Sequence, residues 1–205
     1  MRIVHALTRK PWTTTQSTID NLHVGGTIRL PKEKVGLRTF MCVVTVVFGV
    51  VLVIYSSRMA LPDWRPLSEP WLLWLNTAIL IAGSAGMQWA FVSARRSHAK
   101  GMRAGLLAGG VGAFAFLAGQ LMAWKLMIDA GYFAAANPSN AFFYMITGLH
   151  ALHLMGGLAA WGWTSVRVWR GVDASRVRLS IELCANYWHF LLLVWLVMFG
   201  LMLAT

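Results

Sequence analysis

The chain has 205 residues, of which 58% are hydrophobic and only 12% are charged. A soluble domain carries about twice that charged fraction, so the composition excludes an ordinary soluble protein and indicates a membrane protein. The formal net charge of +11 would suit nucleic-acid binding if the charges gathered on one folded surface. They lie instead between long apolar segments, so no nucleic-acid partner is predicted.

The first 33 residues are polar, rich in threonine and basic. They contain no apolar run of the kind that a secretory signal peptide needs. We therefore expect two parts, a polar basic cytoplasmic tail over residues 1–33 and a transmembrane domain over residues 34–205.

Five stretches after this tail lack charge for long enough to cross a hydrocarbon core, which takes about 20 helical residues. Open sheet edges cannot lie in lipid, and the stretches show no two-residue alternation, so helices are expected. The fourth helix should start near Ser139, after the turn signal Asn137-Pro138. The predicted fold is an all-α membrane protein, a bundle of five transmembrane helices at about 35–57, 70–94, 104–126, 139–166 and 181–204.

The basic residues predict the orientation of the chain. Of the 18 lysines and arginines, all but Arg58, Arg65 and Lys125 lie in the N-terminal tail and in the second and fourth loops. Positively charged loops stay in the cytoplasm. The N-terminus is therefore predicted to be cytoplasmic and the C-terminus to be on the outer side of the membrane.

Small residues indicate where the helices pack closely. Gly101, Gly105 and Gly109 follow one another at four-residue spacing in the third stretch. Small residues at this spacing let two helix backbones approach. The predicted packing positions are Gly105, Gly109, Gly112, Gly148, Gly156 and Gly157.

Polar side chains form one stripe on each of the last two helices. His150 and His153 are three residues apart, and Glu182, Asn186 and His189 follow at spacings that also keep one face. A short basic loop joins the two helices, so they are antiparallel neighbours. At about 1.5 Å per residue, His153 and His189 lie at similar depth. We predict one structural polar network in which these two histidines share a direct or water-bridged hydrogen bond.

A metal or haem site is the alternative interpretation of the same histidines. Three imidazoles could hold zinc or copper, because neutral histidine is a common metal ligand. No carboxylate accompanies them within the membrane apart from Glu182 at the interface. A free-standing membrane metal or haem protein using His150, His153 and His189 therefore stays the alternative to a hydrogen-bonded network.

Two long motifs resemble subunit III of haem–copper oxidases. The segment from Asn137 to Gly157 reads NPSNAFFYMITGLHALHLMGG and resembles the central signature of that family. The last apolar stretch resembles the signature of the family's last helix at the same spacing: it has Glu182, then YWHF ending at Phe190, then VWL ending at Leu196. The similarity to this family covers about residues 34–204. It includes Trp74-Leu75-Asn76-Thr77, Phe116-Leu117 and Gln120.

The resemblance implies a subunit with no active site, haem, copper or metal site of its own. In this family the oxygen chemistry belongs to subunit I, and electrons arrive through subunit II. Subunit III contacts subunit I directly, binds phospholipid, and supports sustained turnover and proton uptake. The implied function is a non-catalytic subunit of a respiratory terminal oxidase, with a small subunit IV as a further partner and the bacterial inner membrane as its location.

Cytochrome c oxidase is the first interpretation within this family. A quinol oxidase subunit III, or an accessory membrane protein of nitric oxide reductase, is the alternative. The electron donor cannot be read from this chain, because the surface that meets it belongs to subunit II.

The chain departs from the family pattern at three carboxylate positions. Val44, Ala123 and Leu192 stand where many members have an acidic residue. The chain also corresponds to the short five-helix form, without the two N-terminal helices that wall a lipid cleft in the longer form. We therefore expect the aliphatic run from Val43 to Val53 to be part of an exposed face, covered either by annular phospholipid or by extra helices of subunit I or of subunit IV. Van der Waals packing of aliphatic faces favours the helices.

Overall fold

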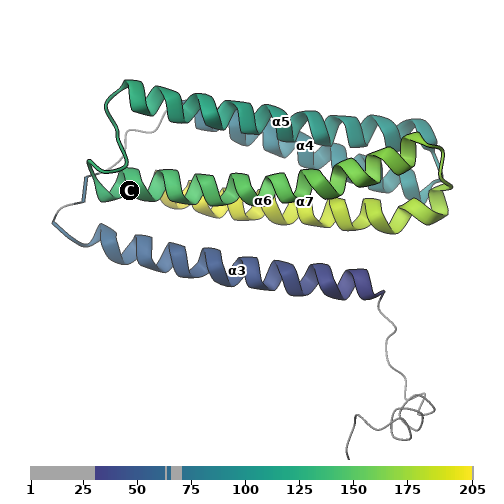
Figure 1. The fold of residues 1–205 in the computed structure, drawn as a ribbon, viewed down its shortest axis with the longest axis horizontal. Helices are drawn as coiled ribbons and strands as arrows, with labels where there is room; N and C mark the ends of the chain where they lie inside the picture. Colours follow the sequence, from purple (N-terminus) through teal and green to yellow (C-terminus); the bar gives the residue numbers. More distant parts are fainter. Residues whose placement is uncertain (1–30, 63, 66–70, 205) are drawn as a thin grey trace, which may run out of the picture. The chain divides into compact units, whose positions relative to one another are not determined.

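The structure is a computed structural model that describes residues 31–62, 64–65 and 71–204. The predicted basic tail lies almost entirely outside these residues. Residues from Gly36 onward form one compact unit. The described part of the chain contains five α-helices and no strand: α3 (Lys32–Met59), α4 (Leu72–Arg95), α5 (Ala99–Asp129), α6 (Pro138–Trp169) and α7 (Ala174–Leu203) (Figure 1).

All five helices are long and apolar enough to cross a membrane, which confirms the predicted fold class. Two of them begin earlier than expected, α5 at Ala99 and α7 at Ala174. The sequence predicted that each of these helices begins only after its basic residues, such as Lys100 and Arg178. Charge limits how far a helix is immersed in hydrocarbon, but long basic side chains can reach water from a helix that continues beyond the lipid.

Local chemistry sets the ends of α6. The Asn137 side chain accepts a hydrogen bond from the backbone N–H of Ser139 at 3.2 Å, and Pro138 occupies the first turn. A polar N-cap followed by proline favours a helix start. Beyond the other end, Gly171 takes a φ of 76°, a left-handed conformation that glycine adopts without strain.

Helices α4 and α5 pack through glycines facing each other. A Cβ at Gly105 would lie 2.7 Å from the carbonyl oxygen of Gly86 and 2.8 Å from the Cα of Ala90. A Cβ at Gly112 would lie 2.9 Å from the Cα of Gly83. These are contacts with backbone, so the two helices can approach this closely only because the side chains are absent.

The glycines of α6 differ from one another. A Cβ at Gly157 would come within 2.9 Å of the Tyr187 ring, whereas one at Gly148 would make only ordinary contact with Trp124, at 3.7 Å. Gly156 is exposed, and nothing lies within 4 Å of a Cβ placed there. No helix of the described chain packs closely on Gly156, so its role as a packing position stays a prediction. Successive helical residues are turned by about 100°, so Gly156 and Gly157 face different surroundings.

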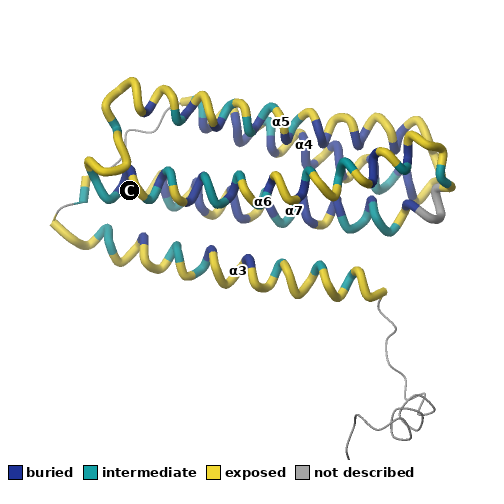
Figure 2. The backbone as a smooth tube through the Cα atoms, in the orientation of Figure 1, coloured by how far each residue is buried: buried dark blue, intermediate teal, exposed yellow. Residues whose placement is uncertain are grey.

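Helix α3 buries a narrow stripe of its surface. Among its residues only Val44, Phe48 and Tyr55 are buried, and Figure 2 shows most of the helix as exposed. The expectation placed the whole run from Val43 to Val53 on an exposed face. Val43 is 56% exposed, but Val44 is 2% exposed and faces the bundle. The spacing of 44, 48 and 55 puts these three residues on one helix face, which explains the difference.

Aromatic rings connect α3 to α6. Phe40 and Phe48 contact the His153 ring, with centroids 6.3 Å and 5.4 Å away. Farther along, Tyr55 meets Phe142 edge-on at 5.5 Å. Such pairs add to the stability gained from burial. Large side chains rather than close backbones therefore hold α3 against α6.

Candidate functional site

His189 of α7 forms a polar clamp with α4. Its Nδ1 accepts a hydrogen bond from the Ser84 hydroxyl at 2.6 Å, and its Nε2 donates to the Gln88 carbonyl oxygen at 3.0 Å. The roles follow from the amide oxygen, which can only accept, so the ring proton lies on Nε2. Both nitrogens of a neutral imidazole are thus used, and the bonds join two helices far apart in sequence.

His153 of α6 lies in different surroundings. Its Nδ1 donates to the carbonyl oxygen of Leu149 on its own helix at 2.8 Å, and its ring faces the aromatic side chains of α3. Its backbone carbonyl accepts a bond from the Tyr187 hydroxyl at 3.1 Å. The contact between α6 and α7 at this level therefore runs through Tyr187.

Both ring nitrogens of His189 are engaged by α4, so a direct hydrogen bond with His153 is not formed, and the water-bridged form of the expected contact stays a prediction. Glu182 is half-buried and Asn186 is exposed. A single network that joins these residues to His150 stays a prediction. The sequence offered a signal that was missed: Ser84 and Gln88 are four residues apart on α4 and therefore share a face.

His150 is fully buried at the centre of α4–α7. Its ring centroid lies 5.6 Å from that of Phe116 and 5.2 Å from that of Trp195. Neither ring nitrogen has a hydrogen-bond partner. The three histidines thus occupy three environments: a polar clamp with α4, an aromatic contact with α3, and an interior site.

This separation bears on the metal interpretation. In the part of the chain that the structure describes, no three side chains among His, Cys, Asp and Glu are grouped as ligands of one ion would be. A shared site needs at least three ligands at about 2.0–2.3 Å from the metal. The arrangement instead suits side chains that join helices.

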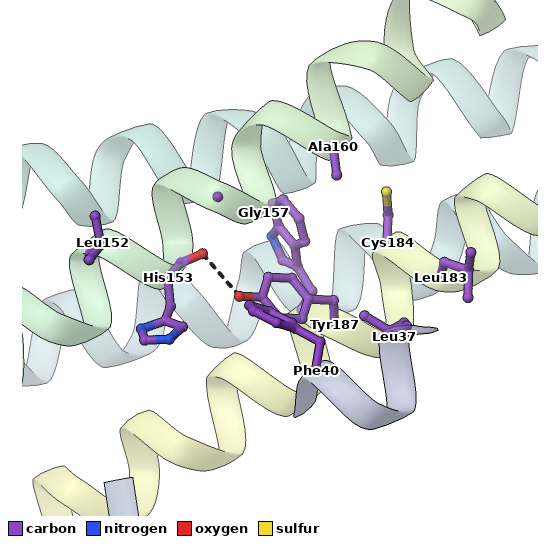
Figure 3. Close-up of a pocket in the computed structure, with 11 residues that line it drawn as sticks. Leu37, Phe40, Leu152, His153, Gly157, Ala160, Leu183, Cys184 and Tyr187 are labelled. Atoms are coloured by element: carbon purple, nitrogen blue, oxygen red, sulfur yellow. Dashed lines mark hydrogen bonds between the residues drawn. The ribbon is translucent and has the colours of Figure 1, made fainter. Parts of the chain in front are cut away.

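A pocket of about 490 Å³ opens between α3, α6 and α7 (Figure 3). Its walls are almost wholly apolar. They include Leu37 and Phe40 from α3, Gly156 and Ala160 from α6, and Leu183 and Tyr187 from α7. Phe40, which lines the pocket, also contacts the rings of His153 and Tyr187, so the pocket lies beside the aromatic contacts between α3 and the helices α6 and α7.

Together, these features define a class: a polytopic α-helical membrane protein whose intramembrane polar side chains join helices to one another. Residues 59–204 match the sequence profile of the family described as cytochrome c oxidase subunit III. The chain therefore belongs to the cytochrome c oxidase subunit III family.

Individual relatives agree with this assignment. Cytochrome c oxidase subunit 3 of Thermostichus vulcanus is 26% identical over 195 residues, which cover 92% of each chain. The probable cytochrome c oxidase subunit 3 of Nocardia farcinica is 30% identical over 147 residues, covering 67% of this chain and 70% of the relative. A longer protein of Aeropyrum pernix, described as heme-copper oxidase subunit I+III, is 27% identical over 184 residues, which cover 83% of this chain and 23% of that protein.

The resemblance found in the sequence is thereby confirmed, and the chain is a subunit III of a haem–copper oxidase. Two of the three positions at which the resemblance implies an acidic residue are buried and apolar here. Val44 is 2% exposed and Ala123 is 0% exposed. Apolar side chains at buried intramembrane positions need no charged partner.

Proposed function

We propose that this chain stabilises subunit I of a respiratory terminal oxidase, first of all a cytochrome c oxidase, and supports its electron transport and proton uptake without catalysing a step. The match over residues 59–204 carries this proposal. The use of the intramembrane polar groups for helix contacts, as in the Ser84–His189–Gln88 clamp, supports a non-catalytic role. The Aeropyrum pernix relative, whose description joins subunits I and III, supports direct contact with subunit I.

Subunit II and a small subunit IV complete the proposed assembly, whose haems and copper belong to subunits I and II. The exposed face of α3, which carries Val43, Val46, Val50 and Val53, is the proposed seat for helices of subunit I or of subunit IV. Aliphatic helix faces hold partners by van der Waals packing rather than by specific bonds. We place the complex in the bacterial inner membrane, with the N-terminus in the cytoplasm, on the strength of the basic loops.

Purification from the native membrane through a tag on this chain tests the proposal. Subunit I should be recovered with it, and haem and copper should follow subunits I and II when the complex is dissociated. The measurements are mass spectrometry of the recovered subunits and an absorbance spectrum with metal analysis of each fraction. Haem or stoichiometric copper on the separated, folded chain would show that the metalloprotein alternative is the right one.

The pocket between α3, α6 and α7 supports a second part of the proposed function, phospholipid binding. Its apolar walls suit an acyl chain. Arg38, next to the lining residue Leu37, is exposed at the predicted cytoplasmic end. A cation at that level favours an anionic headgroup.

Filling the pocket should displace the lipid. Ala160→Phe puts a ring into the lining, and it should lower the amount of phospholipid that stays with the purified complex. Ala118→Phe on α5 is the matched control, because Ala118 is exposed and is not among the lining residues. Phospholipid per complex, measured by quantitative mass spectrometry, should fall only in the first variant. Equal lipid content in both variants would remove the pocket as the binding site.

A further inference from the structure

Three polar side chains lie in the interior of α4–α7 without hydrogen-bond partners. Asn76 and His150 are 0% exposed and Gln120 is 1% exposed. Both polar atoms of each side chain are buried and unpaired. They belong to α4, α6 and α5 respectively, and none of them takes part in the His189 clamp.

Contacts bring Asn76 and Gln120 to one place. A Cβ at Gly119 would collide with the Asn76 amide oxygen, so this amide lies directly against the backbone of α5. Gln120 is the next residue along that helix. Beside Asn76, the Thr77 hydroxyl accepts a hydrogen bond from Trp195 Nε1 at 2.9 Å, which links α4 to α7 at the same level.

Gln120 lies between two contacts that join α5 to α6. One turn before it, Phe116 meets the His150 ring at 5.6 Å. One turn after it, the Trp124 indole donates to the Thr147 hydroxyl at 2.9 Å. Thr147 is three residues from His150, so Gln120 is level with this part of α6.

The ring of contacts closes through α7. Trp195 meets both Phe116, at 4.8 Å between centroids, and His150, at 5.2 Å. Each of the four helices therefore contributes to one belt of the interior. Six of the buried, unpaired side-chain nitrogen and oxygen atoms among the described residues belong to this belt, and the others are single atoms of Trp64, Ser139, Ser165 and Trp188.

Unpaired polar atoms inside a bilayer-spanning bundle are unfavourable, since neither water from the bulk nor lipid can satisfy them. Buried polar groups of folded proteins are nearly always hydrogen-bonded to protein or to ordered water. Six such atoms in one belt therefore indicate a polar site rather than a packing accident.

We propose that Asn76, Gln120 and His150 form an internal hydration site that binds ordered water between α4, α5 and α6. The chemistry of the six atoms selects water. The two amides offer donors and acceptors, and a neutral imidazole offers one of each. Water donates and accepts, and a buried water typically makes about three hydrogen bonds to groups of this kind.

Other small ligands fit the same atoms less well. A cation would leave the amide and imidazole N–H groups unpaired. An anion would leave the carbonyl oxygens and one ring nitrogen unpaired. The inference depends on the interior of this chain alone and not on its proposed role in an oxidase.

The sign of a stability change tests the proposal. In the complex purified from membranes, Gln120→Met keeps the side-chain volume but removes the amide. If water pairs this amide, the thermal midpoint for loss of this chain from the complex should fall by about 2–4 °C, since bonds are lost. Leu106→Met on the same helix is the control, because Leu106 is buried like Gln120, and it should change the midpoint less. A higher midpoint in Gln120→Met would overturn the proposal, because it would mean that the amide is unpaired.

A second measurement needs no variant. A structure of the wild-type complex at a resolution that shows ordered water should place at least one water within hydrogen-bond distance of the His150 ring and of one of the two amides. Direct hydrogen bonds among Asn76, Gln120 and His150, with no water between them, would overturn the proposal. This result would also reassign any loss of stability in Gln120→Met to those direct bonds.

Discussion

Replacing Gly105 with alanine should prevent α4 and α5 from packing and remove most of the folded chain from the membrane. The new Cβ would lie 2.7 Å from the Gly86 carbonyl oxygen and 2.8 Å from the Ala90 Cα. Both neighbours are backbone atoms, so a rotamer change cannot relieve the overlap, and the helices must separate. Overpacking costs about 1–3 kcal/mol where side chains can yield, and we expect a loss at or above the upper end.

The matched control is Gly162→Ala on α6. Nothing lies within 4 Å of a Cβ at Gly162. Alanine favours a helix over glycine by about 1 kcal/mol, so this variant should be as stable as the parent or slightly more stable. The measurements are the amount of chain in the membrane and the thermal midpoint of the purified complex. Equal values for Gly105→Ala and the parent would show that α4 and α5 do not meet as the structure has them.

The sequence predicted the helical architecture well because the membrane leaves few alternatives. Backbone polar groups in lipid must pair within a helix or a closed barrel. A long uncharged stretch without two-residue alternation therefore strongly indicates a membrane-spanning helix. The spacing of Gly105 and Gly109 likewise indicated a close helix contact. It did not identify α4 as the partner, because the three-residue spacing of the complementary glycines, Gly83 and Gly86, gives a helix face but not the helix that this face meets.

The polar contacts were harder to predict, because periodicity gives a face but not the helix that it meets. His153 and His189 were expected to meet from their similar predicted depth, yet α7 turns His189 toward Ser84 and Gln88 of α4. Only the packing order of the helices decides this. The burial of Val44 has the same origin: its run is uniformly aliphatic, so hydropathy could not distinguish the inner face from the outer one.

Replacing His189 with leucine should loosen the attachment of α7 to α4 without stopping oxygen reduction in complexes that still assemble. The substitution removes two hydrogen bonds and leaves the Ser84 hydroxyl, 2% exposed, without its imidazole partner. An unpaired buried group costs about 1–3 kcal/mol, although serine can recover part of this by bonding to its own helix. The thermal midpoint of the complex should fall, while turnover per assembled complex stays unchanged.

A double-mutant cycle isolates the clamp from general damage to the bundle. Ser84→Ala and His189→Leu remove opposite ends of the same 2.6 Å bond, so together they should cost less than the sum of their separate effects. Ser84→Ala combined with His153→Leu is the control pair. His153 bonds to Leu149 and faces α3, so these two effects should add. Additive effects for Ser84 and His189 would contradict the clamp, and loss of turnover in a fully assembled His189→Leu complex would contradict its non-catalytic role. The two readouts separate the hydrogen bond from the function assigned to it, because the cycle reports only on coupling and turnover only on chemistry.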